Sequence, residues 1–451
     1  MTARLRRLDA ATFTRETSRQ RRFAEPQLDA DARRRLRDVF DRELSATEAV
    51  QAIVDDVRTR GDIAVREWTL RLDGVDVADP RVPPSAMAEA WQATAPAIRD
   101  ALNTAAQRIR AFHELQRDGV RRGSDDLHLR AVPLRRAGCY TPGGRAAYPS
   151  TVLMNVLPAR IAGVESVVVA SPPGPGGRPH PAVLAAAHLA RADEVLSIGG
   201  AQAVAALAYG TETIAAVDTI AGPGNVFVTL AKRAVYGSVG VDGLAGPSEI
   251  IVVATDGADP AYVAADLVSQ LEHDPLAWAV CITDSTPLAA AVERAFEDCA
   301  SRAARSGIIA AAAGEHGVLV VCEDMEEALR LVDDFAPEHV ELVGAAAESL
   351  CDRLRTAGAI FVGADSPVPM GDYIAGPNHT LPTGGAARFK GPLSVMDFVR
   401  WPSVTRLSHR QVEELGPAAC VIAEAEGLHG HAASIRLRLD AGSAIVEAPA
   451  T

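Results

Sequence analysis

The sequence predicts an α/β protein: two degenerate nucleotide-fold-like lobes with parallel-type sheets, plus small N-terminal and C-terminal tail domains. Short Val/Ile runs alternate with Ala-rich helical runs from residue 150 onward. The alternation occurs as two successive series, separated by the Gly/Pro-rich stretch 243–247. Strands and helices that alternate at this length form parallel sheets with helices on both faces. Two series therefore indicate two lobes.

The elements follow in order along the chain. Residues 1–32 are Arg-rich and weakly patterned, and residues 33–120 read mostly as helix, with helical apolar spacing over 102–115. The first series predicts strands at 166–170, 194–198 and 217–220, and helices at 181–190, 201–209 and 225–236. The second predicts strands at 250–254, 279–282, 318–321, 340–343 and 359–362, and helices near 260–273, 286–303, 324–334 and 346–357.

Four domains are expected. Residues 1–32 form an N-terminal extension, and residues 33–139 join 248–393 in a discontinuous first lobe. Residues 140–247 form the second lobe. Residues 394–451 have apolar stretches without a clear series and form a C-terminal tail domain.

Composition excludes several functions. The chain has 451 residues, with 45 basic and 58 acidic side chains and a net charge of −13. This acidic balance argues against nucleic acid as a partner, because phosphate binding needs a basic surface. Lys232 and Lys390 are the only lysines. Neither follows the Gly-rich turn of a P-loop, and Schiff-base chemistry would have to use one of them.

The sequence also predicts a cytoplasmic protein without a membrane partner. None of its six cysteines forms a C-x-x-C pair, which is typical of reduced thiols in the cytosol. The N-terminus lacks the apolar segment of a secretory signal. No apolar stretch reaches the roughly 18 residues that a membrane span needs.

Two clusters carry candidate chemistry. Asp259–Pro260 begins a helix on which Gln270 and His273, three residues apart, share a face and could ligate a metal. The alternative is a polar helix end with a solvated His. Glu338 and His339 precede an expected strand and are natural general bases. They can serve one site only if the backbone there is not regular strand; the alternative is a surface turn.

Two further clusters lie closer to the C-terminus. The segment 371–385 is too Gly/Pro-rich for a helix or a strand interior, and it offers Asp372 as an anionic ligand and His379 as a polar one. The segment 424–431 holds His429 and His431 with acids nearby, as metal ligands or as a polar turn.

Two Gly-rich segments, 139–145 and 198–203, precede expected helices whose N-termini could hold a phosphate. Neither is a G-x-G-x-x-G fingerprint. The residues alone therefore support an α/β enzyme and leave metal and nucleotide binding open.

Seven strings in a fixed order give a sharper indication. They are GCYTPGGRAAYPSTVLMNVLPARIAGV at 138–164, GGAQAVAALAYGTETI at 199–214, AGPGNVFVTLAKRAVYG at 221–237, GPSEIIVVA at 246–254, SQLEHDP at 269–275, FAPEHVEL at 335–342 and GDYIAGPNHTLPTGG at 371–385. Together they resemble the histidinol dehydrogenase family over roughly residues 30–440.

The resemblance implies an activity. Members of this family oxidise L-histidinol to L-histidine with two NAD⁺, the last step of histidine biosynthesis. They use one Zn²⁺ per subunit and form an intertwined homodimer whose tail completes the neighbouring site. The second lobe would then be the NAD side.

The resemblance also assigns residues. The implied metal ligands are Gln270, His273, Asp372 and His431, with His429 as a nearby rival for the tail position. Glu338 and His339 match the acid–base pair. The implied substrate contacts are Ser248, Gln270, His273, His339, Asp372, Glu426 and His431. The implied NAD contacts are Tyr140, Gln202 and Asn225.

Three points stay open. A relative that oxidises another small alcohol, or a non-catalytic zinc-binding scaffold on the same fold, is the alternative function. Cys139 adjoins a cofactor position, so a covalent thiohemiacetal route is a further alternative to simple packing. The segment Ser366–Met370 departs from the family pattern beside Asp372.

Overall fold

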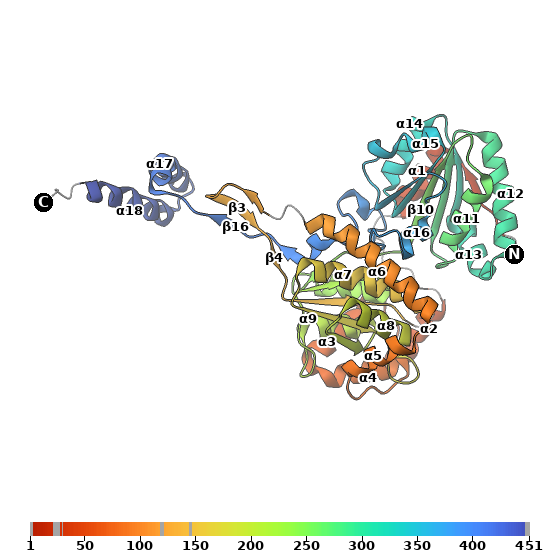
Figure 1. The fold of residues 1–451 in the computed structure, drawn as a ribbon, viewed down its shortest axis with the longest axis horizontal. Helices are drawn as coiled ribbons and strands as arrows, with labels where there is room; N and C mark the ends of the chain where they lie inside the picture. Colours follow the sequence, from red (N-terminus) through yellow and green to blue (C-terminus); the bar gives the residue numbers. More distant parts are fainter. Residues whose placement is uncertain (1–2, 21–27, 29, 118–120, 144–146, 447–451) are drawn as a thin grey trace. The chain divides into compact units, whose positions relative to one another are not determined.

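The computed structural model describes residues 3–20, 28, 30–117, 121–143 and 147–446. The chain divides into two compact units, Met1–Asp118 with Pro133–Val399, and Gly119–Val132 with Arg400–Thr451. The first unit carries two parallel sheets (Figure 1).

A six-stranded sheet has the order β1-β12-β11-β10-β13-β14, and all its ladders are parallel. Its strands are β1 (Arg6–Leu8), β10 (Glu249–Ala254), β11 (Trp278–Thr283), β12 (Gly317–Val321), β13 (His339–Val343) and β14 (Ala359–Val362). Side chains alternate between two cores, because successive strand residues face opposite sides. Ile250 and Val252 pack on one face, and Ile251 and Val253 on the other.

Helices cover both faces of this sheet. The face of Ile250 packs against α11 (Pro260–Leu271), α12 (Thr286–Arg302) and α13 (Ser306–His316). The opposite face packs against α1 (Ala10–Gln20) and α14 (Met325–Phe335). Short segments follow β13 and β14, namely α15 (Ala345–Glu348), η1 (Cys351–Arg353) and α16 (Val368–Tyr373).

A five-stranded parallel sheet has the order β7-β6-β5-β8-β9. Its strands are β5 (Arg136–Tyr140), β6 (Ser166–Ser171), β7 (Glu194–Ser197), β8 (Thr219–Ala221) and β9 (Gly240–Val241). Strand order reverses at β5, since β6 lies on one side of it and β8 on the other. Ligands bind beyond the carboxyl ends of strands at such a switch point.

Helices cover both faces of this second sheet as well. One face is covered by α5 (Pro84–Ala93), α6 (Pro96–Arg117), α7 (Pro149–Ala162) and α8 (Pro181–Ala190). The other is covered by α3 (Ala46–Arg60), α4 (Asp62–Asp73), α9 (Gly200–Tyr209) and α10 (Val226–Val235). α2 (Ala30–Phe40) precedes them, and η2 (Ala386–Arg388) and η3 (Val395–Phe398) come late in the first unit.

The second unit is small. Its three-stranded antiparallel sheet has the order β16 (Ser403–Thr405), β3 (Leu127–Arg130), β2 (Arg121–Gly123). Two helices, α17 (His409–Ala425) and α18 (His429–Val446), pack around Cys420, Ala423 and Ala432. β4 (Val132–Pro133) and β15 (Val399–Arg400) lie where the chain passes from one unit to the other.

The expected α/β class and the eight expected strands are confirmed, but the expected division of the chain differs from the packing. Residues 33–117 pack on the five-stranded sheet, not on the lobe of 248–393. Residues 1–32 are not a mere extension, because β1 pairs with β12. The expected tail at 394–451 begins nearer Arg400 and includes residues 119–132. The helix expected at 346–357 is only α15 and η1.

Among the described residues, no helix is long and apolar enough to cross a bilayer. The cytoplasmic location stays a prediction.

Candidate active site

The candidate acid–base pair lies where β10 and β13 begin. Glu338 occupies a bend directly before β13, and its side chain is buried. Its Oε2 accepts hydrogen bonds from the Ser248 hydroxyl at 2.5 Å and from the Glu249 N–H at 2.8 Å. The alternative of a surface turn is therefore excluded.

His339, the first residue of β13, lies on the same side as Glu338. Its Nδ1 is 3.5 Å from Glu338 Oε2, which the bend before the strand allows. Because Val340 packs on the α14 face, His339 faces the α11 side of the sheet. The condition that the backbone must not be regular strand at both residues is thus met.

The backbone of Glu249 fixes the state of the His339 ring. His339 Nδ1 lies 2.9 Å from the Glu249 carbonyl oxygen, which can only accept, so Nδ1 carries the hydrogen. Nε2 then holds a lone pair and can take a proton.

Burial raises the pKa of Glu338 above its ordinary value, and the negative charge of Asp372 adds to this rise. The neighbouring His339 and the hydrogen bonds from Ser248 and Glu249 oppose it. A carboxyl group whose pKa is moved toward neutrality is suited to general acid–base work.

α11 brings Gln270 to the same edge of the sheet. Asp259 caps this helix by accepting from the Ala261 N–H at 2.8 Å, with Pro260 at the first helical position, as the sequence predicts. The helix runs back from the carboxyl end of β10 to the amino edge of the sheet, where the parallel strand β11 begins. It ends at Leu271, two residues before the predicted end, so His273 follows the helix and is exposed, whereas Gln270 is buried.

Asp372 lies in the last turn of α16, although the sequence predicts no helix there. Pro369 stands in the first turn, where proline favours helix, and it belongs to the unusual Ser366–Met370 segment. The Asp372 carbonyl accepts from His379 Nδ1 at 2.7 Å. Burial lowers the pKa of His379, the charge of Asp372 opposes this, and His339 and His273 add to it. These groups therefore lie within electrostatic reach of one another.

The side chains at this edge meet only some of the requirements of a metal site. Gln270 Nε2 is buried with no hydrogen-bond partner among the described atoms, and rotation of the amide exchanges its nitrogen and oxygen. Across the described part of the chain, no group of three or more His, Cys, Asp or Glu side chains could hold a metal. Glu426, His429 and His431 are exposed side chains of the second unit, so the tail ligand stays a prediction.

The three expected cofactor residues lie at the carboxyl edge of the five-stranded sheet. Tyr140 ends β5, and its hydroxyl oxygen accepts from the Gly200 N–H at 3.1 Å. Burial raises the pKa of Tyr140 to about 12. Gln202 is buried near the start of α9, and its Oε1 has no partner among the described residues. Asn225 caps α10 by accepting from two backbone N–H groups at 3.0 and 3.2 Å. Tyr140 and Asn225 follow β5 and β8, the two strands that meet at the switch point, and Gln202 follows β7 at the edge of the sheet.

The loop 371–385 connects the two edges. Its Asn378 Nδ2 donates to the Met154 carbonyl of α7 at 2.6 Å, and the Thr380 hydroxyl donates to Asn155 Oδ1 at 3.2 Å. Asn155 Nδ2 in turn lies 3.4 Å from the Tyr140 carbonyl oxygen, to which it donates. Asn155 is not among the residues predicted from the sequence. The sequence feature that could have identified it is a single amide side chain within the apolar run TVLMNVL at 151–157.

The covalent route through Cys139 has no support. Cys139 is fully buried, and burial raises the pKa of its thiol well above the ordinary range. A reactive cysteine needs the opposite shift. In the Gly-rich segment beside it, Gly144 and Arg145 fall outside the described residues.

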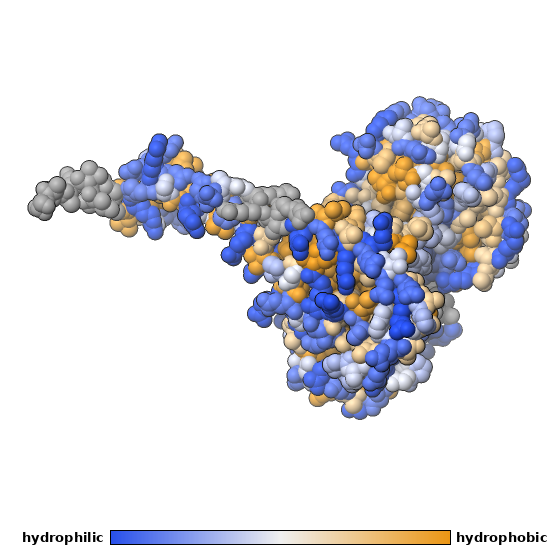
Figure 2. Space-filling view, in the orientation of Figure 1, coloured by the Kyte–Doolittle hydropathy of each residue, from blue (hydrophilic) through white to orange (hydrophobic). Residues whose placement is uncertain are grey.

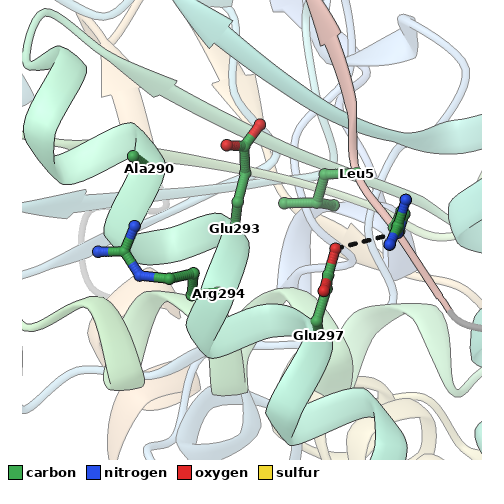
Figure 3. A pocket seen from close by; sticks show the side chains of 6 residues that line it. Leu5, Ala290, Glu293, Arg294 and Glu297 are labelled. Carbon is green, nitrogen blue, oxygen red and sulfur yellow. Dashed lines mark ion pairs between the residues drawn. The ribbon is translucent and has the colours of Figure 1, made fainter.

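A surface hollow lies elsewhere, between the start of the chain and α12 (Figure 3). It is lined by Arg4, Leu5, Ala290, Glu293, Arg294 and Glu297. Arg4 and Glu297 form a solvated ion pair at 3.1 Å across it. Exposed pairs of this kind are common on protein surfaces and mark no chemistry.

Comparison with known proteins decides the family. The family profile described as histidinol dehydrogenase matches residues 37–439. Histidinol dehydrogenase of Parasynechococcus marenigrum (strain WH8102) is 51% identical over 394 residues, covering 86% of this chain and 90% of that protein. The chain belongs to the histidinol dehydrogenase family.

Further relatives agree. Histidinol dehydrogenase of Cereibacter sphaeroides is 49% identical over 397 residues, covering 87% of this chain and 91% of that protein. The crystal structure of histidinol dehydrogenase from Elizabethkingia anophelis matches with a TM-score of 0.88 at 28% identity, covering 98% of this chain and 100% of that one. The resemblance drawn from the seven strings is therefore confirmed.

One prediction concerns the Ser248–Glu338 hydrogen bond. Ser248→Ala removes a donor that lowers the pKa of Glu338, so the carboxyl group of the variant should stay protonated to a higher pH than in the wild-type protein. Infrared titration of the protonated carboxyl band, assigned by its loss in Glu338→Gln, measures this. Ser349→Ala, an exposed serine that donates to the Ala346 carbonyl, is the control. An unmoved midpoint in Ser248→Ala contradicts the assigned role.

Proposed function

We propose that this chain oxidises L-histidinol to L-histidine, a four-electron oxidation that consumes two NAD⁺ and completes histidine biosynthesis. One observation carries the proposal: a buried Glu338–His339 pair, oriented by the backbone of one residue, Glu249, in a chain of the histidinol dehydrogenase family. The buried pair also favours an enzyme over a non-catalytic scaffold. Burying and orienting two titratable side chains costs stability, and such groups are typical of catalytic sites.

His339 serves as the base for the alcohol. Its Nδ1 is committed to the Glu249 carbonyl, so Nε2 is the atom that takes the hydroxyl proton as the alcohol becomes an aldehyde. Because the imidazole ring is already oriented, the reaction does not lose the entropy that ordering the ring would cost.

Glu338 serves in the second half of the reaction. Its carboxylate takes a proton from water, which adds to the aldehyde and gives the hydrate that is oxidised to the acid. Burial makes the carboxylate a stronger base than a solvated glutamate, and Ser248 and Glu249 keep it in place. The two residues thus divide the proton transfers between them.

Gln270, His273 and Asp372, with His431, would hold Zn²⁺. The unpartnered amide of buried Gln270 supports this set, and so does the electrostatic cluster around Asp372. Bound zinc supplies Lewis-acid polarisation and orientation of the amino alcohol. Ser248 and Glu426 would add substrate contacts beside these ligands and His339.

Tyr140, Gln202 and Asn225 would bind NAD, which supplies the hydride acceptor. Their support is their position at the carboxyl edge of one sheet. Tyr140 and Asn225 follow the two strands between which the strand order reverses, and Gln202 follows β7. Asn225 also caps α10, whose N-terminus suits a phosphate. This edge of the sheet can therefore offer a site for NAD although the chain lacks the G-x-G-x-x-G turn.

The partner would be a second copy of this chain, with His431 or its neighbour His429 reaching the other copy's site. The two-helix hairpin of the second unit has a small core and leaves large apolar side chains exposed, as the orange atoms among the blue in Figure 2 illustrate. These side chains are Leu415, Val421, Ile422, Leu428 and Leu437. Exposed apolar groups on so small a unit support a protein partner.

His339→Asn tests the proposed base. We expect kcat for L-histidinol to fall about 10²- to 10⁴-fold, while the zinc content of the purified protein stays at the wild-type level. Cys139→Ser is the matched control, because Cys139 lies near the cofactor edge without a role in proton transfer, and it should retain kcat. Unchanged turnover in His339→Asn would remove this residue as the base.

Mixing two inactive variants tests the shared site. In a mixed dimer of His431→Ala and Asp372→Ala, one site keeps both ligands, so random pairing should restore about a quarter of wild-type activity. Turnover of the mixture is compared with each variant alone. A mixture as inactive as its components would show that the tail ligand does not cross between copies.

A further inference from the structure

We propose that Lys232 and Asp242 form a buried ion pair that positions the turn 222–225 and thereby sets the affinity for NAD. The pair takes no part in proton transfer, so both are positioning residues. The inference rests on the proposed function, which makes this edge of the five-stranded sheet the NAD site.

The turn begins where the ladder between β5 and β8 stops. These strands pair in register from Ala137 with Thr219 to Cys139 with Ala221. Gly222, the next residue, leaves the sheet with φ at +113°. Its backbone groups therefore need partners other than those of the ladder.

Lys232 and Asp242 supply those partners. The Gly222 N–H donates to Asp242 Oδ2 at 2.7 Å, and the Gly222 carbonyl accepts from Lys232 Nζ at 2.5 Å. Lys232 Nζ also lies 2.5 Å from Asp242 Oδ1. One ion pair thus holds both polar backbone groups of a single residue.

The pair is desolvated, and it joins three elements. The side chains of Lys232 and Asp242 are 3% and 5% exposed. Lys232 lies on α10, and Asp242 follows β9 directly. The turn, the helix that Asn225 caps and the edge strand are therefore fixed relative to one another.

The end of β5, the other strand at the switch point, is held in a matching way. Asn155 Nδ2 donates to the Tyr140 carbonyl, which β8 no longer reaches. A Cβ at Gly222 would lie 2.1 Å from that oxygen and 2.8 Å from Asn155 Nδ2, so only glycine fits. Where the ladder between β5 and β8 stops, side chains therefore bond the backbone of both strands: Asn155 at Tyr140, and Lys232 with Asp242 at Gly222.

The effect of the ion pair on the position of Gly222 can be measured separately from its effect on the stability of the fold. Replacing a buried ion pair by uncharged groups of similar shape is often neutral for stability, whereas removing one partner leaves a buried charge unpaired. Removing both charges therefore keeps the fold, while loss of the Lys232 ammonium frees the Gly222 carbonyl. Misplacement of a binding group by about 1 Å is enough to weaken binding severalfold or more.

The test is the double variant Lys232→Met with Asp242→Asn. We expect KM for NAD and the NAD dissociation constant, measured by calorimetry, to rise about tenfold, with kcat changed much less and zinc content unchanged. The control is Lys390→Met with Asp397→Asn, since the other lysine also pairs with an aspartate, within the segment 390–397. This control should leave both constants at wild-type values.

Unchanged NAD affinity in the folded double variant overturns the inference, and so does a fall in kcat with KM unaltered. Should this double variant not fold, Lys232→Gln with Asp242→Asn, which also removes both charges, is measured in its place, and wild-type affinity there overturns the inference equally. Failure of the proposed function looks different: the wild-type protein itself would then neither bind NAD nor oxidise L-histidinol.

Discussion

The site depends on the backbone of one residue, Glu249, at the start of β10. Its N–H donates to the Glu338 carboxylate, and its carbonyl accepts from His339 Nδ1. The parallel register of β10 and β13 pairs Ile250 with His339 and so places both groups beside this peptide. Because strand pairing in a buried sheet admits no slip without exposing the core, Glu338 and His339 are held as firmly as the sheet itself.

The candidate site residues lie at two sheet edges, the amino edge of one sheet and the carboxyl edge of the other. The six-stranded sheet offers its amino edge, where Glu338, His339 and the end of α11 lie, and the five-stranded sheet offers the carboxyl edge of its switch point. The loop 371–385 bonds to α7, which follows the carboxyl end of β5. Asn155 is the residue where these parts meet, because its amide bonds both Thr380 and the Tyr140 carbonyl.

The alternation of Val/Ile and Ala-rich runs predicted the strands closely, since local period decides them, and the predicted helix correctly carries Gln270. Tertiary packing decides which sheet a helix covers, and local sequence does not encode it. The prediction therefore places residues 33–117 with residues 248–393, whereas they pack on the five-stranded sheet. The pairing of Lys232 with Asp242 depends on a turn that brings β9 beside α10, which no spacing rule encodes. Asp372 was read as loop because glycine and proline outweighed the helix-starting effect of Pro369.

The central claim is that one anchored carboxylate and one oriented imidazole carry an alcohol through both oxidations at a single site. The ratio of NADH formed to L-histidinol consumed, with the product identified, tests it most directly. The account predicts two NADH for each L-histidinol, with L-histidine as the product. A ratio of one, with the aldehyde released, would contradict it.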